Sequence, residues 1–326
     1  MKKTIPRVAI ITRTRDRGIL LERAIQSVHN QTMQDFVHVI INDAGDPGVV
    51  DTLIEKYKPL IKGRVKVVHN KSSNGMEAAS NKAIRSVESM FIAIHDDDDT
   101  WHPDFLKMTT EYLEATGDKG VVVTTDKIDE EIVDGNTIKK INQARWLPDV
   151  RTIGLYRQCL DNYATPITFL YRREVYDELG GYDETLPVAG DWDFALRFLL
   201  KHDIYYLLTK EALAYYHHRA STDGVNQNSV FLNNGLLHEQ KINTIMNKYL
   251  RSELEKGTLG LGYLISSVHE QKSMVNNINR HVSELIDTNV VRLEGHINYT
   301  SDKQIQEIRL HSALAWIRRN VFKRNA

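Results

Sequence analysis

Apolar runs and segments of helical spacing alternate along the first hundred residues. The apolar runs have the length of buried strands; they are Arg7–Thr12, Phe36–Asn42, Val65–His69 and Met90–Ile94. The segments between them repeat apolar residues every three or four positions, as amphipathic helices do; they are Ile19–Asn30, Val49–Tyr57 and Gly75–Ser86. Strands and helices in alternation are typical of βαβ units. The pattern therefore predicts an α/β fold, Rossmann-like, with a mainly parallel sheet and flanking helices.

The pattern is less regular after residue 120. Further strands are predicted at Gly120–Thr125, Thr165–Tyr171, Ile204–Leu208 and Ala212–His217, and helices at Glu174–Leu179 and Trp192–His202. The polar stretch Asp126–Arg151 predicts no clear element. From about Asn226 the spacing is helical to the end, and the turn-rich segment Ser221–Asn228 marks the change. We therefore expect an α/β domain at 1–225 and a helical C-terminal region at 226–326.

Composition and charge narrow the class of protein. Of 326 residues, 41% are hydrophobic and 26% are charged, which is ordinary for a folded domain. The 42 basic and 43 acidic residues leave a net charge of −1, so we expect no nucleic acid among its partners. A single cysteine, Cys159, excludes an internal disulfide. Because no signal region or membrane-spanning apolar stretch is seen, the sequence predicts a cytoplasmic protein, with peripheral contact at the cytoplasmic face of a membrane left open.

The sharpest feature is an apolar run that ends in four carboxylates. Phe91–Ile94 reads as a buried strand, and Asp96–Asp99 follow it after His95. Adjacent carboxylates repel one another and resist burial unless a cation is near. Carboxylate oxygens suit Mg²⁺ or Mn²⁺, which commonly hold a phosphate as well. Taken alone, a solvated acidic turn explains the run equally well.

Other polar clusters follow other predicted strands and helices. Thr12–Arg17 follows the first strand and Asn42–Gly45 the second, while Asn74 precedes a helix. Ligands of open α/β sheets bind outside the carboxyl ends of the strands, where such clusters meet. Two more motifs come later in the chain, Gly180-Gly181-Tyr182-Asp183-Glu184 and Asp191-Trp192-Asp193.

These motifs, taken in order, resemble the GT-A-fold glycosyltransferases of family 2, an inverting family that uses nucleotide sugars. The acidic run followed by Trp101-x-Pro103 and the Gly-Gly-Tyr-Asp-Glu motif before Asp-Trp-Asp carry most of the resemblance. It extends from Arg7 to Arg219, about two-thirds of the chain. The resemblance implies a GT-A fold, a nucleotide-sugar donor, a glycan or lipid-linked glycan acceptor, and Mn²⁺ or Mg²⁺ as cofactor.

The resemblance also implies roles for individual residues. Asp191 matches the catalytic base, and Asp98 matches the metal ligand, with His218 or its neighbour His217 beside it. The positions that match nucleotide-binding residues are Thr12, Arg17, Asp43, Asn74, Asp96 and Asp97. The residues next to the base, Trp192 and Asp193, match an acceptor-binding position. For Trp192 and for the histidines, an ordinary core position is the competing interpretation.

Three positions depart from the family pattern. Asp16 stands where relatives often have Asn, a mild change. Ser80 stands where they have Arg, so an expected basic contact is missing unless Lys82 supplies it. Gly190 stands where they have Glu, which removes one carboxylate next to Asp191.

The implied chemistry needs few groups. A divalent cation neutralises the leaving diphosphate and replaces a protonated acid. One carboxylate then suffices as general base for the acceptor hydroxyl. Asp191 opens a helix, where free N–H groups and the helix dipole favour the ionised form. A plain N-cap explains Asp191 in isolation, and the acidic run upstream is what favours the catalytic interpretation.

The C-terminal region carries two apolar patterns. Val275, Ile278, Val282 and Leu285 follow a 3-4 spacing, which predicts a helix packed within the chain or a short coiled coil between copies. Leu310–Ala326 combines an aromatic and aliphatic face with a cationic fringe, as helices at membrane interfaces do. A core-docked helix with a solvated basic face is the competing interpretation of that segment.

The sequence predicts an inverting, metal-dependent glycosyltransferase that moves a sugar, from a UDP-sugar, to a hydroxyl of a surface polysaccharide or glycolipid. A nucleotidyltransferase is the first alternative, although its glycine-rich basic loop is missing from Thr12–Gly18. A non-catalytic module that binds a sugar or a lipid carrier is the second. The intact Asp98 and Asp191 disfavour it.

Overall fold

The computed structural model describes residues 5–135, 137–186, 189–220, 224–228 and 236–320. For 236–239, 241, 294–301 and 316–320 it describes the backbone alone. The chain divides into two compact units, Met1–Ser266 and Ser267–Ala326. The first unit thus extends beyond residue 225, and a functional boundary near Asn226 stays a prediction.

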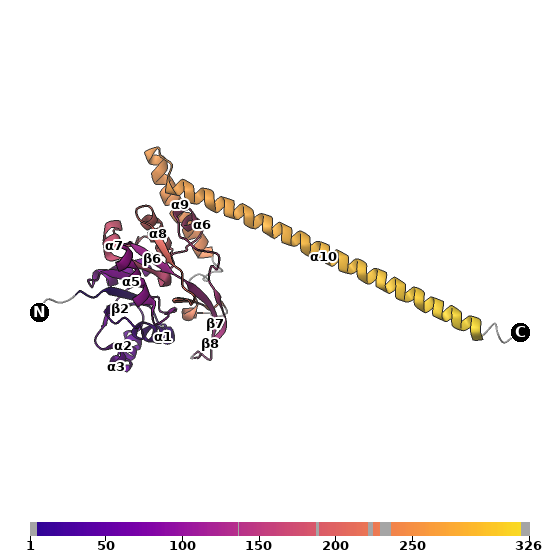
Figure 1. Ribbon diagram of the computed structural model, residues 1–326, viewed down its shortest axis with the longest axis horizontal. Coiled ribbons are helices and arrows are strands. Elements are labelled where there is room, and N and C mark those ends of the chain that lie inside the picture. The colour runs from indigo at the N-terminus through magenta and orange to yellow at the C-terminus, as the bar shows by residue number, and fades with distance from the viewer. Residues whose placement is uncertain (1–4, 136, 187–188, 221–223, 229–235, 321–326) are drawn as a thin grey trace. The chain divides into compact units, whose positions relative to one another are not determined.

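The elements of the chain are shown in Figure 1. The strands are β1 (Val8–Thr14), β2 (Phe36–Asp43), β3 (Val65–Asn70), β4 (Phe91–Ile94), β5 (Thr100–Trp101), β6 (Gly120–Val123), β7 (Thr125–Val133), β8 (Thr137–Arg145), β9 (Phe169–Arg172), β10 (Ile204–Leu207) and β11 (Ala214–His218). The helices are α1 (Gly18–His29), α2 (Pro47–Lys56), α3 (Lys58–Ile61), α4 (Met76–Arg85), α5 (Phe105–Thr116), α6 (Leu155–Leu160), α7 (Arg173–Leu179), α8 (Gly190–Leu199), α9 (Leu236–Lys256) and α10 (Leu261–Asn320), with 3₁₀ turns η1 (Pro166–Thr168) and η2 (Gly224–Asn226).

A seven-stranded sheet forms the centre of the first unit. Its order is β10-β6-β9-β4-β1-β2-β3. Strand β9 is antiparallel to β4 and β6, while every other pair in this sheet is parallel. The carboxyl ends of β1, β2, β4, β6 and β10 therefore meet at one edge. The predicted α/β fold with a mainly parallel sheet is confirmed.

The central strands are apolar throughout because both of their faces are covered. In β1, Val8 and Ile10 pack into one core layer, and Ala9 and Ile11 into the other. All four side chains are fully buried. Parallel strands with helices on both faces lack the alternation of half-exposed strands, which is why short apolar runs located them.

The polar stretch that predicted no element forms part of a second sheet. Its strand order is β5-β11-β7-β8, and β7 and β8 make an antiparallel hairpin. Nearly every side chain of β8 is exposed. A strand with no buried face carries no apolar alternation, so the pattern could not reveal it.

Helices α9 and α10 follow the α/β core. At the start of α10, a side chain on Gly262 would lie 2.4 Å from the backbone nitrogen of Leu250 in α9, so only glycine permits this close contact. The described side chains at 273–293 are all exposed, including Ile278 and Ile286. Within the described residues, no helix combines the length and the apolar character needed to cross a bilayer.

Overpacking at the sheet should destabilise the first unit. A side chain at Gly120 would lie 2.8 Å from the rings of Phe169 and Phe198. We expect Gly120→Val to lower the free energy of unfolding by about 2 kcal/mol, as measured by urea titration. Gly154→Ala is the control, because its side chain would meet nothing within 4 Å, and it should change stability by less than about 0.5 kcal/mol. Equal stability of both variants would contradict the packing described for β6.

Candidate active site

The polar clusters of three strand ends meet around the acidic run. Residues Asp96–Asp99 follow β4, which lies beside β1 in the sheet, and β2 lies on the other side of β1. Asp97 and Asp99 are buried, whereas Asp96 and Asp98 are partly exposed. The predicted meeting of these clusters at the carboxyl edge follows from the order of the strands.

One arginine from β1 and one from the loop after it neutralise part of the acidic run. Arg13 donates two hydrogen bonds to Asp96 Oδ1, at 2.9 and 2.6 Å. Arg17 Nη1 lies 3.2 Å from Asp97 Oδ1 and 3.5 Å from Asp98 Oδ2. Such pairing allows adjacent carboxylates to share a half-buried loop despite their mutual repulsion.

Asp98 has a second cationic partner from a distant part of the chain. The fully buried Arg219 approaches Asp98 Oδ2 to 2.6 Å, and Asn228 donates to the same oxygen at 3.2 Å. Burial opposes ionisation, but Arg219 and Arg17 outweigh it and lower the pKa of Asp98. Asp98 is therefore ionised at neutral pH. Its Oδ1 accepts no hydrogen bond from the part of the chain that the structure describes.

The two buried carboxyls of the run, Asp97 and Asp99, differ from Asp98 in that their pKa values are raised. Burial raises the pKa of Asp97 to about 6, in spite of Arg17. Burial and the neighbouring Asp98 raise the pKa of Asp99 well above its ordinary value. Asp99 Oδ1 accepts the backbone N–H of His217 at 2.9 Å. The run thus keeps Asp97 and Asp99 within the protein and leaves Asp98 charged and partly exposed.

A buried network on Glu130 holds Arg219 in place. Glu130, in β7, accepts hydrogen bonds from Arg23 at 2.7 Å and from Arg219 at 2.9 Å. His217 Nδ1 lies 2.7 Å from the same carboxylate. Burial opposes the charge, but hydrogen bonds with His217 and Arg23 lower the pKa of Glu130. This network joins α1, β7 and β11 beneath the acidic run.

The carboxylates fit a cation that is shared with a phosphate ligand. Mg²⁺ is commonly held by one or two carboxylates together with substrate phosphates. Asp98 supplies an ionised carboxylate with one open oxygen, and Asp96 lies beside it. No group of three or more His, Cys, Asp and Glu side chains could hold an ion unaided within the described ranges. The donor set therefore suits a cation bound together with a diphosphate.

The two neighbouring histidines differ in their surroundings. His217 uses both ring nitrogens, on Glu130 and on Thr100 Oγ1 at 2.8 Å. The ring of His218 packs edge-on against Tyr216, with the centroids 4.3 Å apart. Burial lowers the pKa of His218 to about 4, so it is a neutral imidazole, the form that ligates metals. Its role as a ligand stays a prediction.

The predicted nucleotide-binding residues differ in exposure. Asp43, at the end of β2, accepts hydrogen bonds from Asn70 at 2.8 Å and from the Ser73 hydroxyl. Asn74 follows and is exposed. Thr12 is fully buried, and its hydroxyl lies 2.8 Å from His38 Nε2. Since its hydroxyl already has a partner inside the protein, we leave Thr12 out of the proposed site.

Arg17 also connects the first loop to the segment after β11. It donates to the carbonyl oxygens of Val225 and Gln227, each at 2.6 Å. Arg219 donates to the carbonyl of Asn226 at 2.9 Å. The segment 224–228 therefore lies next to the acidic run, which the sequence pattern did not indicate.

Helix α8 carries the predicted base. Asp191 lies in its first turn and accepts a hydrogen bond from Asn162 at 2.7 Å. Trp192 is buried and donates to the Gln158 carbonyl at 2.6 Å. Asp193 is fully buried and accepts hydrogen bonds from Arg197 and from the Tyr249 hydroxyl, each at 2.7 Å. The contacts of Trp192 and Asp193 are internal, so we propose an acceptor contact for neither.

At two of the three departures from the family pattern, Ser80 and Gly190, a side chain from elsewhere in the chain lies close by. Arg13 reaches Ser80 Oγ at 3.3 Å, so a guanidinium lies where the sequence lacks one. The Glu77 side chain occupies the space that a side chain on Gly190 would take, with its carbon atoms 2.5 Å from that position. Arg13 Nη1 and Glu77 Oε2 lie 3.8 Å apart. A basic and an acidic group are therefore present beside Asp191, although they come from other positions in the sequence.

Sequence reasoning missed the residues that support the acidic run. Arg13, Glu77, Glu130, Arg219 and Asn228 contact residues far away along the chain, so no local spacing reveals them. One signal was available, since Arg13 and Arg17 flank the first strand end with two positive charges.

Two curated relatives share part of the chain. The first is the uncharacterized glycosyltransferase YwdF of Bacillus subtilis. The two sequences are 26% identical over a segment that covers 59% of this chain and 67% of YwdF. A shorter segment, 33% of this chain, is 28% identical to 42% of TuaG of the same organism, which is named for teichuronic acid biosynthesis. The chain thus spans about two-thirds or less of each relative.

Solved structures and a family profile identify the fold and the family. TarS 1–349 of S. aureus with UDP-GlcNAc superposes with a TM-score of 0.55 at 18% identity, over 74% of this chain and 67% of TarS. The mannosyltransferase PcManGT of Pyrobaculum calidifontis, with GDP-Man and Mn²⁺, gives 0.54 at 16% identity, over 76% and 65%. These likenesses establish the GT-A fold. The profile of Glycosyl transferase family 2 matches residues 8–180, more than half of the chain, and the chain belongs to this family.

Proposed function

We propose that the chain is an inverting, metal-dependent glycosyltransferase that moves a sugar from a UDP-sugar to a hydroxyl of a surface polysaccharide or glycolipid. One observation carries the proposal. The ionised Asp98 keeps an open oxygen at the carboxyl edge of the sheet, and two carboxylates interact with one arginine nearby. Arg13 binds Asp96 and also attracts Asp191, in the first turn of α8. Membership of the family and the GT-A fold support it.

The donor lies across the carboxyl edge in this proposal. Asp43, at the end of β2, accepts the N–H of a uracil base, with the exposed Asn74 nearby. Asp96 and Asp97 lie next to the ribose, and Arg17 next to the diphosphate. Asp98, with His218 as the second candidate, holds the Mn²⁺ or Mg²⁺ ion, which when bound supplies charge neutralisation for the departing diphosphate.

Asp191 acts as the general base in this proposal. Its Oδ2 is held by Asn162 at 2.7 Å, which fixes the direction of the carboxylate. A carboxylate in the first turn of a helix is favoured in its ionised form. It removes the proton of the acceptor hydroxyl as that oxygen attacks the sugar from the face opposite the diphosphate, which inverts the anomeric centre.

Glu77 supplies the acidic group that Gly190 lacks. Its side chain is 2% exposed, and its Oε2 has no hydrogen-bond partner in the described structure. Burial raises the pKa of Glu77 to about 8, against the effect of Arg13. Glu77 is therefore largely protonated at neutral pH and positions Arg13 and Asp191 without adding a negative charge.

The C-terminal helix is proposed as a site of association. Val282, Leu285 and Ile286 are 47%, 50% and 57% exposed, which is unusual for a 60-residue helix without a partner. A second copy of α10 would cover this stripe. Contact of 310–326 with the cytoplasmic face of a membrane also stays a proposal, and 316–326 of that segment lies outside the described side chains.

Removing either carboxylate should abolish transfer. We expect Asp191→Asn to lower kcat for UDP release by about 100-fold or more, because the general base is lost. Asp98→Asn should lose most Mn²⁺-stimulated activity. UDP release from UDP-sugars with an acceptor mixture measures both. Asp177→Asn, on the exposed face of α7, is the control and should retain full activity. Full activity of the Asp191 variant would contradict the proposed base.

Glu77 and Gly190 should behave as one unit. Glu77→Ala removes the acid and should lower UDP release by about 10-fold or more. Gly190→Glu alone should destabilise the fold by about 1–3 kcal/mol, because Glu77 already fills that space. The double variant should regain both stability and activity, and a double-mutant cycle measures the coupling. Additive losses would show that the two positions do not share a role.

The titration of Glu77 provides an independent test that this acid is buried. An unfolded chain releases its proton near pH 4.5, whereas the folded protein holds it until about pH 8. The free energy of unfolding should therefore fall as the pH rises through this window. Glu77→Gln keeps the shape but removes the titration, so its unfolding free energy should fall less. Identical slopes would contradict the buried acid.

The stripe on α10 should drive self-association. We expect the purified chain to sediment as a dimer or larger species, and Ile286→Lys to shift it to the monomer. Glu284→Lys, which lies two positions from both Val282 and Ile286 and so on the other side of the helix, is the matched control and should leave the association intact. Analytical ultracentrifugation measures the masses. A monomeric parent chain, or the same response in both variants, would reject the proposal.

A further inference from the structure

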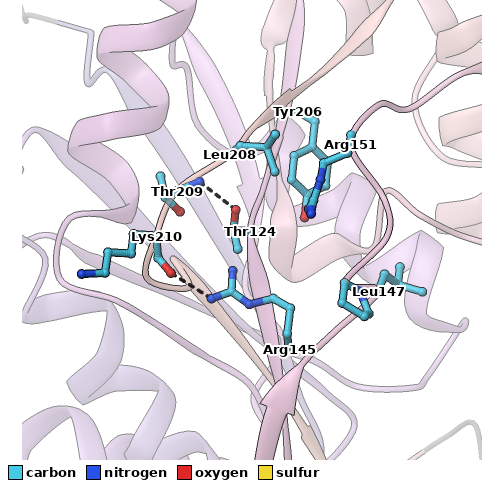
Figure 2. Close-up of a pocket in the computed structure, with 9 residues that line it drawn as sticks. Thr124, Arg145, Leu147, Arg151, Tyr206, Leu208, Thr209 and Lys210 are labelled. Carbon is cyan, nitrogen blue, oxygen red and sulfur yellow. Dashed lines mark hydrogen bonds between the residues drawn. The ribbon is translucent and has the colours of Figure 1, made fainter.

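A cavity lies on the same edge of the sheet as the acidic run. It has a volume of about 310 Å³ and lies where β6 and β10 end, beside the loop that follows β8 (Figure 2). Strand β9 separates β6 from β4 in the sheet, and β10 lies beyond β6. Because neighbouring strands lie about 4.8 Å apart, the cavity is roughly 10–15 Å from the acidic run along this edge.

The cavity carries unbalanced positive charge. Arg145, Arg151 and Lys210 line it. Arg145 Nε pairs with Asp126 at 3.0 Å, and its Nη2 donates to the Lys210 carbonyl at 3.0 Å. Arg151 forms no ion pair or hydrogen bond with the described part of the chain, whereas Lys210 turns its carbonyl toward Arg145 and its ammonium away from the other lining residues (Figure 2). One unpaired cation, Arg151, is thus available to a ligand, in a protein whose net charge is −1.

The remaining wall combines apolar and hydroxyl groups. Figure 2 shows the ring of Tyr206 together with Leu147, Leu208 and Thr124 around the cavity. Burial raises the pKa of Tyr206, so its hydroxyl stays protonated and able to donate. An aromatic face with nearby hydroxyls and cations suits a polar ring that bears an anionic substituent.

The cavity is also connected to the proposed active site. Trp146 directly follows Arg145, and its ring lies 5.3 Å from that of Tyr216 and 5.8 Å from that of His218. The segment that supplies Arg145 to the cavity therefore continues to the histidine next to the acidic run. A chain molecule lying along this edge would meet both sites.

We propose that this cavity binds a carboxylate or phosphate substituent of the acceptor glycan. The inference rests on the proposed function, since it places the acceptor chain along the edge that holds Asp98. Arg151 forms charge-assisted hydrogen bonds with the anionic group, and the ring of Tyr206 packs against the sugar that carries it. The site selects acidic glycans over neutral ones.

Binding of defined oligosaccharides to the full chain tests this assignment. Isothermal titration calorimetry compares a glucuronate-containing hyaluronan tetrasaccharide with neutral chitotetraose, and the acidic probe should bind at least tenfold more tightly. Arg151→Gln should weaken that binding by about tenfold, whereas Lys210→Gln, whose ammonium points away from the cavity, should leave it unchanged. Arg251→Gln and Lys107→Gln remove exposed cations outside the cavity and should leave it unchanged. Equal binding of the two probes, or equal responses of all four variants, overturns the proposal.

Two further measurements distinguish this proposal from binding of a free anion and from the proposed donor site. Inorganic phosphate is titrated against the acidic probe, and competition at equal affinity would assign the cavity to a free anion and reject the glycan. The melting-temperature shift caused by UDP with Mn²⁺ should be the same in all four variants. If UDP gives no shift in the parent chain, the proposed donor site fails, while the calorimetric comparison still decides the cavity.

Discussion

The arrangement of this protein depends on neutralising a run of carboxylates at a sheet edge. Isolated buried charges are very costly, and a cluster of like charges is more so. The cations that offset it come from opposite ends of the α/β region, Arg17 after β1 and Arg219 after β11. Arg219 lies 121 residues from Asp98 along the chain. The acidic run therefore determines where the segment 224–228 lies, because both arginines also bind its carbonyl oxygens.

The cationic partners do not occupy every carboxylate oxygen of the acidic run. Asp98 is held by Arg219 and Asn228 through one oxygen only, and the buried Asp99 is bound from the backbone. A fully paired cluster would be a structural ion-pair network with nothing left to offer a ligand. An ionised carboxylate with one open oxygen is the state in which protein donors meet a cation and a diphosphate together.

The sequence was most informative where local burial sets the pattern. The strands β1, β2 and β4 were predictable because two covered faces produce continuous apolar runs. The hairpin β7–β8 was not, since β8 is exposed on both faces. Glu130 lies on that hairpin, so the network beneath the acidic run was hidden as well. Trp192 was predicted at the acceptor from its motif, yet its indole donates to a buried carbonyl.

Positions 80 and 190 show that a group missing from a motif can be supplied from elsewhere in the chain. Ser80 and Gly190 are small, and each absence looked like a lost contact. Gly190 leaves the room in which Glu77 lies, and the Arg13 and Glu77 side chains are 3.8 Å apart. Because Glu77 would collide with a side chain at position 190, these two positions are coupled by packing, and Arg13 and Ser80 are joined by a hydrogen bond. A glutamate at 190 would need a smaller residue at 77, so only one of the two positions can carry the acidic group.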